Sequence, residues 1–193
     1  TQMLGLALGL TALLLVVSLR DELLNTWQTK IPVDAPNQFA LNIADHELDG
    51  FRGAMQQAGL HYSDIYPVVR GRLTAINNKP VQTAVSKENP DEARDESLNR
   101  ELNLTWAKDL PHGNTLSSGQ WWTKDSAINK EVSVEKRLAE RLNIQMGDTL
   151  TFTLAEGTLQ AKVGSLREVD WDSFQPNFYV VFPPGVIEHF PAS

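Results

Sequence analysis

The longest apolar run in the chain lies at its N-terminus. Residues 3–19 are seventeen consecutive uncharged positions, with Thr11 and Ser18 as the only polar side chains. A helix of this length covers about 26 Å, slightly less than a bilayer core of about 30 Å. The run therefore predicts a transmembrane helix, to which we expect residues upstream of Thr1 to add length. A secretory signal peptide is the main alternative, but residues 18–21 lack the small-x-small pattern of a cleavage site.

Small residues mark one face of this expected membrane helix. Gly5, Gly9 and Ala12 follow each other at helical spacing, and such a face lets a second transmembrane helix approach closely. The alternative is that small residues are simply common in membrane helices.

The helical pattern continues beyond the apolar run. Leu19, Leu23, Leu24 and Trp27 share one stripe, and Pro32 is expected to end the helix. We therefore interpret residues 1–30 as a transmembrane helix with an extramembrane extension. A stiff rod of this kind suits the transmission of movement, so the stripe is a candidate coupling helix.

Residues 31–193 read as an extramembrane domain that mixes strands and helices. A strand is expected at residues 38–43, a helix follows with apolar positions at helical spacing, and Gly59 is placed to end that helix. The apolar run 65–76 predicts a strand in which Gly71 indicates a bulge, and residues 77–78 a turn. Residues 83–99 are strongly charged and read as a solvated surface segment.

The C-terminal half continues the mixture. Strands are expected at residues 101–106, 149–154, 158–163 and 178–182, the last apolar at every position. Ser133 is placed to cap a helix through Leu142. Because helices and hairpins alternate without a regular repeat, the expected class is α+β.

Composition and charge narrow the function. With 41% hydrophobic and 21% charged residues the chain can bury a core, and a net charge of −7 argues against nucleic acid as a partner. The chain has no cysteine, which excludes a disulfide, a catalytic thiol and a zinc–thiolate site.

No catalytic or cofactor motif is complete. His46-Glu47 begins like a zinc-protease motif, but Gly50 stands where the second histidine is required. Gly113 and Gly119 are six residues apart and Gln120 follows, whereas a Walker A loop needs a spacing of five and a lysine. No GxSxG is present. We therefore expect neither catalysis, nor a metal, nor a cofactor on this chain.

Aromatic residues near polar loops are the candidate binding surface. Trp121, Trp122, Trp171 and Phe174 are of the type that anchors partners at protein surfaces. Ordinary core packing is the alternative for most of them, since aromatic residues dominate core burial.

Three segments resemble a known family. They are YPVVRGRLTAINNKPV at residues 66–81, LNLTW through SGQWW at residues 102–122, and VSVEKRLAERLNIQMGDTLTF at residues 132–152. The chain is similar there to the extracytoplasmic domain of FtsX/MacB/LolC-type ABC transporter permeases, and residues 165–185 resemble the YbbP-like subgroup. The resemblance implies a βαβ-type lobe from residues 38–82 and 174–193, and an inserted strand-rich lobe at about residues 100–165.

The resemblance also implies a function. Such a permease subunit couples ATP hydrolysis, with ATP and Mg on a separate cytoplasmic subunit, to handling of lipid or hydrophobic molecules at the periplasmic face of the bacterial inner membrane. Implied partners are the ABC ATPase, other transmembrane helices of the same permease, membrane lipid and a periplasmic esterase. The alternative is a non-transporting, membrane-anchored module that recruits or regulates a periplasmic hydrolase.

Overall fold

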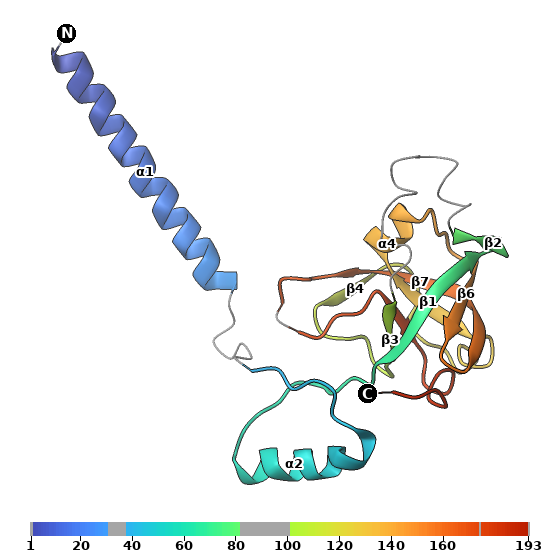
Figure 1. Ribbon diagram of the computed structural model, residues 1–193. Helices are drawn as coiled ribbons and strands as arrows, with labels where there is room; N and C mark the ends of the chain where they lie inside the picture. The colour runs from blue at the N-terminus through green and yellow to red at the C-terminus, as the bar shows by residue number, and fades with distance from the viewer. Residues whose placement is uncertain (1, 31–37, 82–100, 174, 193) are drawn as a thin grey trace. The chain divides into compact units, whose positions relative to one another are not determined.

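A computed structural model describes residues 2–30, 38–81, 101–173 and 175–192 of the chain. Internal contacts divide the chain into two units, Thr1–Asn37 and Gln38–Ser193. The first unit contains one long helix, and the second contains a sheet with short helices (Figure 1).

The helix of the first unit, α1, spans Gln2–Lys30. It runs on past Arg20 without a break, as the spacing of its apolar residues predicts, while Pro32 lies outside the described residues. Apolar side chains are exposed around the whole helix, including Leu6 at 73%, Leu10 at 58% and Leu14 at 61%.

Helix α1 was predicted to cross a membrane. Over the part of the chain that the structure describes, no helix combines the length and the apolar composition that a membrane crossing requires. This result does not confirm the predicted transmembrane helix, which stays a prediction.

Six strands of the second unit form a closed ring. In ring order they are β1 (Val69–Ile76), β3 (Leu102–Trp106), β8 (Val180–Phe182), β5 (Glu131–Glu135), β7 (Gly157–Val169) and β6 (Thr149–Leu154), which returns to β1. The pairs β3–β8 and β5–β7 are parallel, and the other four pairs are antiparallel. Two strands lie outside the ring: β2 (Lys79–Pro80) pairs with β1, and β4 (Asn114–Gly119) pairs with β7.

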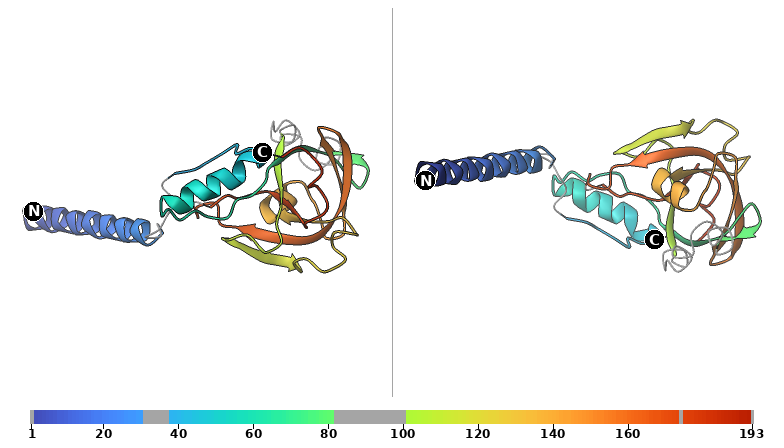
Figure 2. Two further views of the ribbon diagram at one scale, coloured as in Figure 1. Left: turned by 90° about the horizontal axis from the view of Figure 1, so that it is seen from below. Right: turned by 90° about the horizontal axis from the view of Figure 1, so that it is seen from above.

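Short helices complete the second unit, which confirms the α+β class. They are the 3-10 turn η1 (Asp45–Glu47), α2 (Leu48–Gln57) and α4 (Lys136–Arg141). Helix α4 follows β5 directly and lies over one end of the barrel (Figures 1 and 2). Strands from both predicted lobes pair within this one ring, so the two-lobed division stays a prediction.

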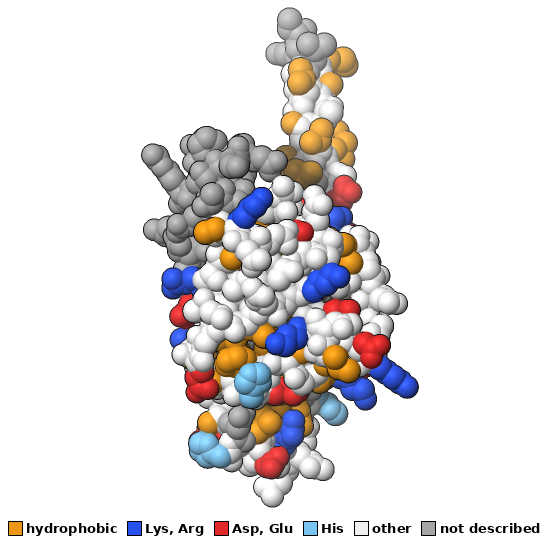
Figure 3. All heavy atoms as spheres, turned by 90° about the vertical axis from the view of Figure 1, so that its right-hand side faces the viewer, with side chains coloured by type: hydrophobic (Ala, Val, Ile, Leu, Met, Phe, Trp, Pro, Cys, Tyr) orange, Lys and Arg blue, Asp and Glu red, His pale blue; other side chains and the backbone are white. Residues whose placement is uncertain are grey.

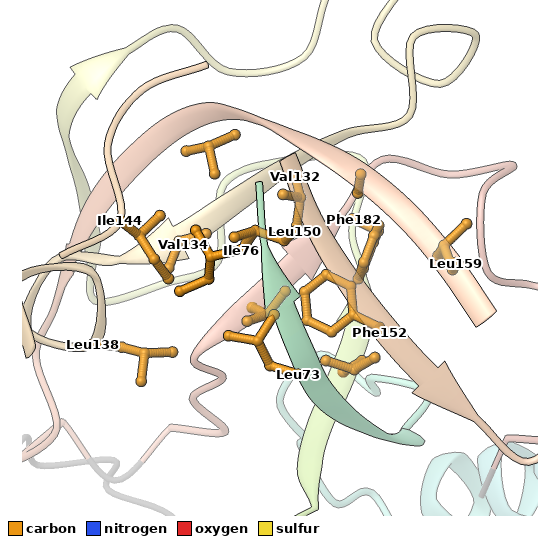
Figure 4. Close-up of a cluster of buried hydrophobic side chains, with 14 of the residues drawn as sticks. Leu73, Ile76, Val132, Val134, Leu138, Ile144, Leu150, Phe152, Leu159 and Phe182 are labelled. Carbon is orange, nitrogen blue, oxygen red and sulfur yellow. The ribbon is translucent and has the colours of Figure 1, made fainter. Parts of the chain in front are cut away.

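The hydrophobic core fills the barrel. Alternate residues of each strand point inward because successive side chains of a strand face opposite sides. Leu150 and Phe152 of β6 are completely buried, and the ring of Phe152 meets that of Phe182 edge-on at 5.6 Å (Figure 4). All three residues of β8 are buried, as expected for a strand covered on both faces.

Three local predictions were wrong. Residues 38–43, all described, form no strand, because Asn42 has a φ of 58° and this left-handed conformation interrupts an extended backbone. Ser133 caps no helix: it is buried in β5, where its hydroxyl accepts a hydrogen bond from Ser165 at 2.9 Å, and Glu135 caps α4 instead. Gly71 is not a bulge, since the pairing of β1 with β6 shifts between Leu73 and Ala75.

Candidate functional site

A cleft of about 900 Å³ opens on the second unit beside the barrel. Its walls come from three places in the chain: the connection from α2 to β1 at residues 62–67, the loop at residues 106–110 that ends β3, and the C-terminal loop with Pro184 and Glu188. Strand β3 pairs with both β1 and β8, so the ring itself brings the three segments together.

Tyr66 forms the inner wall of the cleft. Its ring packs against Phe178 at a centroid distance of 5.6 Å, and its hydroxyl donates a hydrogen bond to Asp64 Oδ2 at 3.4 Å. Burial, and next the nearby negative charge of Asp64, raise the pKa of Tyr66 to about 12. The phenol is therefore neutral at physiological pH and can act as a hydrogen-bond donor.

The remaining lining mixes apolar surface with both signs of charge. Ile65, Trp106 and Leu110 are half-buried, whereas the charged groups stand at the exposed rim. The cationic side chains in the lining are Arg52, Lys108 and, when protonated, His112; the acidic ones are Asp64, Asp109 and Glu188.

The rim charges interact weakly with each other. His112 Nε2 lies 3.9 Å from Asp64 Oδ2, and both side chains are mostly exposed, so this ion pair contributes little stability. Lys and Arg side chains are scattered rather than gathered on the face shown in Figure 3. Such a site suits an uncharged or zwitterionic amphiphile better than a polyanion.

Trp121 and Trp122 brace one wall of this cleft from behind. Their rings lie 4.2 Å apart, and their indole nitrogens donate to the carbonyl oxygens of Lys108 at 2.9 Å and Ala107 at 2.6 Å. Both are half-buried. The structure therefore links these two residues to the shape of the cleft, and their predicted contact with a partner or substrate stays a prediction.

Trp171 lies apart from that pair, in the loop between β7 and β8. Its ring stacks on Tyr179 at 4.7 Å, and both side chains are 38% exposed. Phe174 falls outside the described residues. The four aromatic residues thus do not form one described surface.

A buried polar network that the motif search missed supports the cleft. Arg167 of β7 is completely buried; it donates to Asn114 Oδ1 at 2.7 Å and to the carbonyl oxygen of Phe178, against which Tyr66 packs. Burial lowers the pKa of Arg167 to about 10, and the charge of buried Glu135 opposes that shift. The signal was available in the sequence, because Arg167 continues the inward alternation of residues 159, 161, 163 and 165.

Two carboxylates, Asp170 and Asp172, flank Trp171 in the loop after β7. The backbone N–H of Asp172 donates to Asp170 Oδ1 at 3.1 Å, which fixes an exposed turn. Among the described residues, no three His, Asp or Glu side chains are grouped so that they could hold a metal ion.

The chain was compared with known proteins. No protein-family model matches the chain. The whole chain of 193 residues is 41% identical to a protein described as an uncharacterised ABC transporter permease, YbbP of Escherichia coli strain K12. The chain spans about a fifth of that relative, 22% of its length. It is thus homologous to a segment of an ABC transporter permease, which confirms the resemblance drawn from the sequence.

Proposed function

We propose that this chain belongs to the permease subunit of an ABC transporter of the mechanotransmission type. The observation that carries the proposal is the identity of 41% to a permease along the whole chain. Because the chain spans only 22% of that relative, the activity, substrate and partners of the complete protein are part of the proposal.

The surface of α1 supports a place in the membrane. A helix that is apolar on all sides requires apolar surroundings, and the side chains of Leu6, Leu10 and Leu14 are exposed in the isolated chain. A helix of 29 residues is about 43 Å long, which exceeds a bilayer core by more than two turns. We place the part before Arg20 in the bacterial inner membrane, and residues after about 30 in the periplasm.

The face with Gly5, Gly9 and Ala12 is proposed to contact other transmembrane helices of the same permease. A methyl group added at Gly5 or Gly9 would meet no atom within 4 Å, so this face is open in the described structure.

The extension of α1 is proposed to transmit movement. Its backbone is helical through Lys30, and Leu23 and Leu24 are 63% and 44% exposed. In the proposed mechanism a separate cytoplasmic subunit binds ATP and Mg and hydrolyses the ATP. The resulting shift of the membrane helices moves the stripe of Leu19, Leu23, Leu24 and Trp27, and with it the periplasmic domain.

The cleft beside the barrel is the proposed place for handling lipid or another hydrophobic molecule. Trp106, Ile65 and Leu110 offer apolar surface, the neutral Tyr66 hydroxyl offers a hydrogen-bond acceptor, and the rim offers both signs of charge to a headgroup. A periplasmic esterase that acts on the presented molecule is the proposed further partner.

A second candidate function is a non-transporting module that recruits or regulates a periplasmic hydrolase. The observation that favours it is the stacked pair of Trp171 and Tyr179, two partly exposed aromatic side chains of a kind that anchors protein partners. Substitution of Trp171 then abolishes hydrolase binding, whereas substitutions in the cleft leave it unchanged.

Helix continuity gives the test of the transporter proposal. In the complete permease, reconstituted with its ATPase, Leu24→Pro breaks α1 beyond the apolar run at a cost of about 3 kcal/mol. ATP hydrolysis is expected to continue while release of labelled lipid from the outer leaflet stops. Leu24→Ala is the matched control, because it shortens the same exposed side chain and keeps the helix. Unchanged lipid release in Leu24→Pro would contradict the lever mechanism.

Native mass spectrometry of the complete permease tests the partners. The proposal expects an ATPase together with lipid or a periplasmic hydrolase in the extracted complex. A permease that carries neither an ATPase nor lipid would contradict it.

A further inference from the structure

The chain between α1 and the barrel carries apolar side chains that the barrel does not use. Phe39, Leu41, Leu60 and Tyr62 are 62%, 81%, 57% and 47% exposed. No side chain whose burial is described between residues 38 and 68 is buried, and the first buried side chain of the second unit is Val69. We define residues 38–62 as the interfacial segment.

Helix α2, at the centre of this segment, is amphipathic. Leu48, Phe51 and Met55 recur at helical spacing on one side, with Asp49 and Gln56 on the other. None of its ten residues is buried, and its N-cap residue, Glu47, makes no side-chain capping hydrogen bond.

The helix also has a composition that does not favour helix formation by itself. Gly50 and Gly53 lie inside it, and open space surrounds the position that a methyl group would take at either residue. Isolated helices of about ten residues are marginal in water, so a helix like this one depends on an apolar surface for its stability. Phe51 meets Tyr62 edge-on at 6.2 Å, which brings α2 and the C-terminal end of the segment into contact.

We propose that the interfacial segment lies in the outer surface of the lipid bilayer, with its apolar side chains at the boundary between headgroups and acyl chains. The inference rests on the proposed function, because it takes the apolar part of α1 to be in the membrane. Amphipathic helices with exposed Phe, Tyr and Leu bind membrane surfaces in this way.

Chain length permits this position. From Arg20 to Lys30 the helix rises about 15 Å above the point where charges begin. Nine residues lead from Lys30 to Phe39, and an extended chain of nine residues reaches about 30 Å, twice the distance needed to return to the bilayer surface. A lipid surface is therefore within reach of every copy of this chain, without a further protein partner.

Charge identifies the kind of lipid contact. Residues 38–62 contain three acidic residues against one arginine, so attraction to anionic headgroups does not hold the segment at the surface. Burial of the apolar side chains holds the segment at the surface instead, so the contact is expected to form on zwitterionic lipid alone.

The absence of cysteine from the chain makes a labelling test direct. The full chain is inserted in phosphatidylcholine vesicles after attaching a nitroxide to one of the variants Leu13→Cys, Leu41→Cys, Leu60→Cys or Ile128→Cys. Accessibility of each label to oxygen, which concentrates in lipid, and to a water-soluble nickel chelate is measured by electron paramagnetic resonance. Ile128 is the matched control, because this apolar side chain is 79% exposed on the barrel unit.

The labels separate the two proposals. At positions 41 and 60 oxygen accessibility is expected to exceed nickel accessibility, as at position 13, with the reverse at position 128. A label at position 13 in lipid with labels at 41 and 60 in water would overturn the inference and leave the proposed function intact. A label at position 13 in water would overturn the proposed function.

Two further outcomes decide against the inference. Labels at 41 and 60 that are shielded from both reagents would show that protein covers the segment, either a second copy or another part of the permease. Lipid exposure that arises only after phosphatidylglycerol is added would show electrostatic adsorption instead of apolar insertion. Equal insertion with and without phosphatidylglycerol supports it.

Discussion

Arg167 offers the sharpest test of how the cleft is held in shape. The substitution is Arg167→Met, which keeps most of the side-chain volume and removes the guanidinium. Its two hydrogen bonds tie β7 to Asn114 and to the backbone of Phe178, whose ring supports Tyr66.

The expected loss of stability in Arg167→Met follows from the contacts of the guanidinium. Two hydrogen bonds from a charged donor contribute about 3–6 kcal/mol together. Against this, burial lowers the pKa of Arg167 to about 10 even with the opposing charge of Glu135, which corresponds to a cost of about 3 kcal/mol for the charged form. The substitution recovers that cost, but it leaves Asn114 Oδ1 and the Phe178 carbonyl without the Arg167 donor and removes the positive charge that acts on buried Glu135. We therefore expect a loss of about 3–5 kcal/mol in the free energy of unfolding.

Urea unfolding of the full chain in detergent, followed by tryptophan fluorescence, measures the effect. Four of the five tryptophans lie in the barrel unit, so the signal reports mainly on that unit. Arg70→Met is the matched control, since Arg70 is exposed on β1, and it is expected to change stability by less than about 0.5 kcal/mol.

A second variant and a lower limit on the stability loss make the test of Arg167 decisive. Arg167→Lys is expected to lose most of the same stability, because an ammonium group cannot serve two acceptors with the fixed fork of a guanidinium. A loss below about 1 kcal/mol in Arg167→Met would refute the reasoning, because it would mean that the hydrogen bonds do no more than offset the burial of the charge.

Three further predictions concern single positions. Gly71→Ala places a methyl group 2.7 Å from atoms of Leu104 and Leu154, so thermal unfolding is expected to show a loss of about 1–2 kcal/mol, whereas Gly50→Ala, which has open space, is expected to stabilise. The difference between alkaline absorbance titrations of the parent chain and Tyr66→Phe is expected to show a phenolate with a pKa near 12; Asp64→Asn shifts it to lower pH because a neighbouring negative charge disfavours ionisation. Since the Tyr66 pKa is higher in the folded than in the unfolded chain, its contribution to stability is complete below about pH 10 and falls as pH rises towards 12. Trp171→Ala is expected to weaken hydrolase or lipid binding in a pull-down assay with little change in melting temperature; a large drop would assign Trp171 to packing against Tyr179 alone.

Strands were predictable from the sequence where the strand they pair with is close along the chain. Residues 149–154 and 158–163 alternate between polar and apolar and lie in the hairpin of β6 and β7, so pattern and structure agree there, although β7 continues to Val169. Closure of the ring was not predictable, because it depends on the pairing of β3 with β8 across more than seventy residues. Residues 38–43 alternate as a strand does, but Asn42 has a φ of 58° and none of these residues pairs with the sheet.

The residues of the candidate site were likewise predictable only in part. The sequence identified the aromatic residues as candidates by their residue type. It could not show that Trp121 and Trp122 donate hydrogen bonds to the carbonyl oxygens of Lys108 and Ala107 and so support the cleft wall. Gly71 was recognised as special, but its reason lies in side chains of β3 and β6 that approach it from both neighbours in the barrel. Arg167 was hidden because a charged residue was not expected to continue an inward-facing alternation.

The order of elements along the chain connects the proposed movement to the proposed site. The chain runs from α1 to the barrel through residues 31–68. Residues 62–67 of this connection form one wall of the cleft, and Arg52 of α2 also lines it. The opposite wall, residues 106–110, belongs to the barrel and is fixed by the two tryptophan hydrogen bonds. In the proposed mechanism a displacement of α1 reaches the barrel through residues 62–67. This wall is also held to the barrel, because the Thr105 hydroxyl of β3 donates a hydrogen bond to the carbonyl oxygen of Pro67 at 2.7 Å.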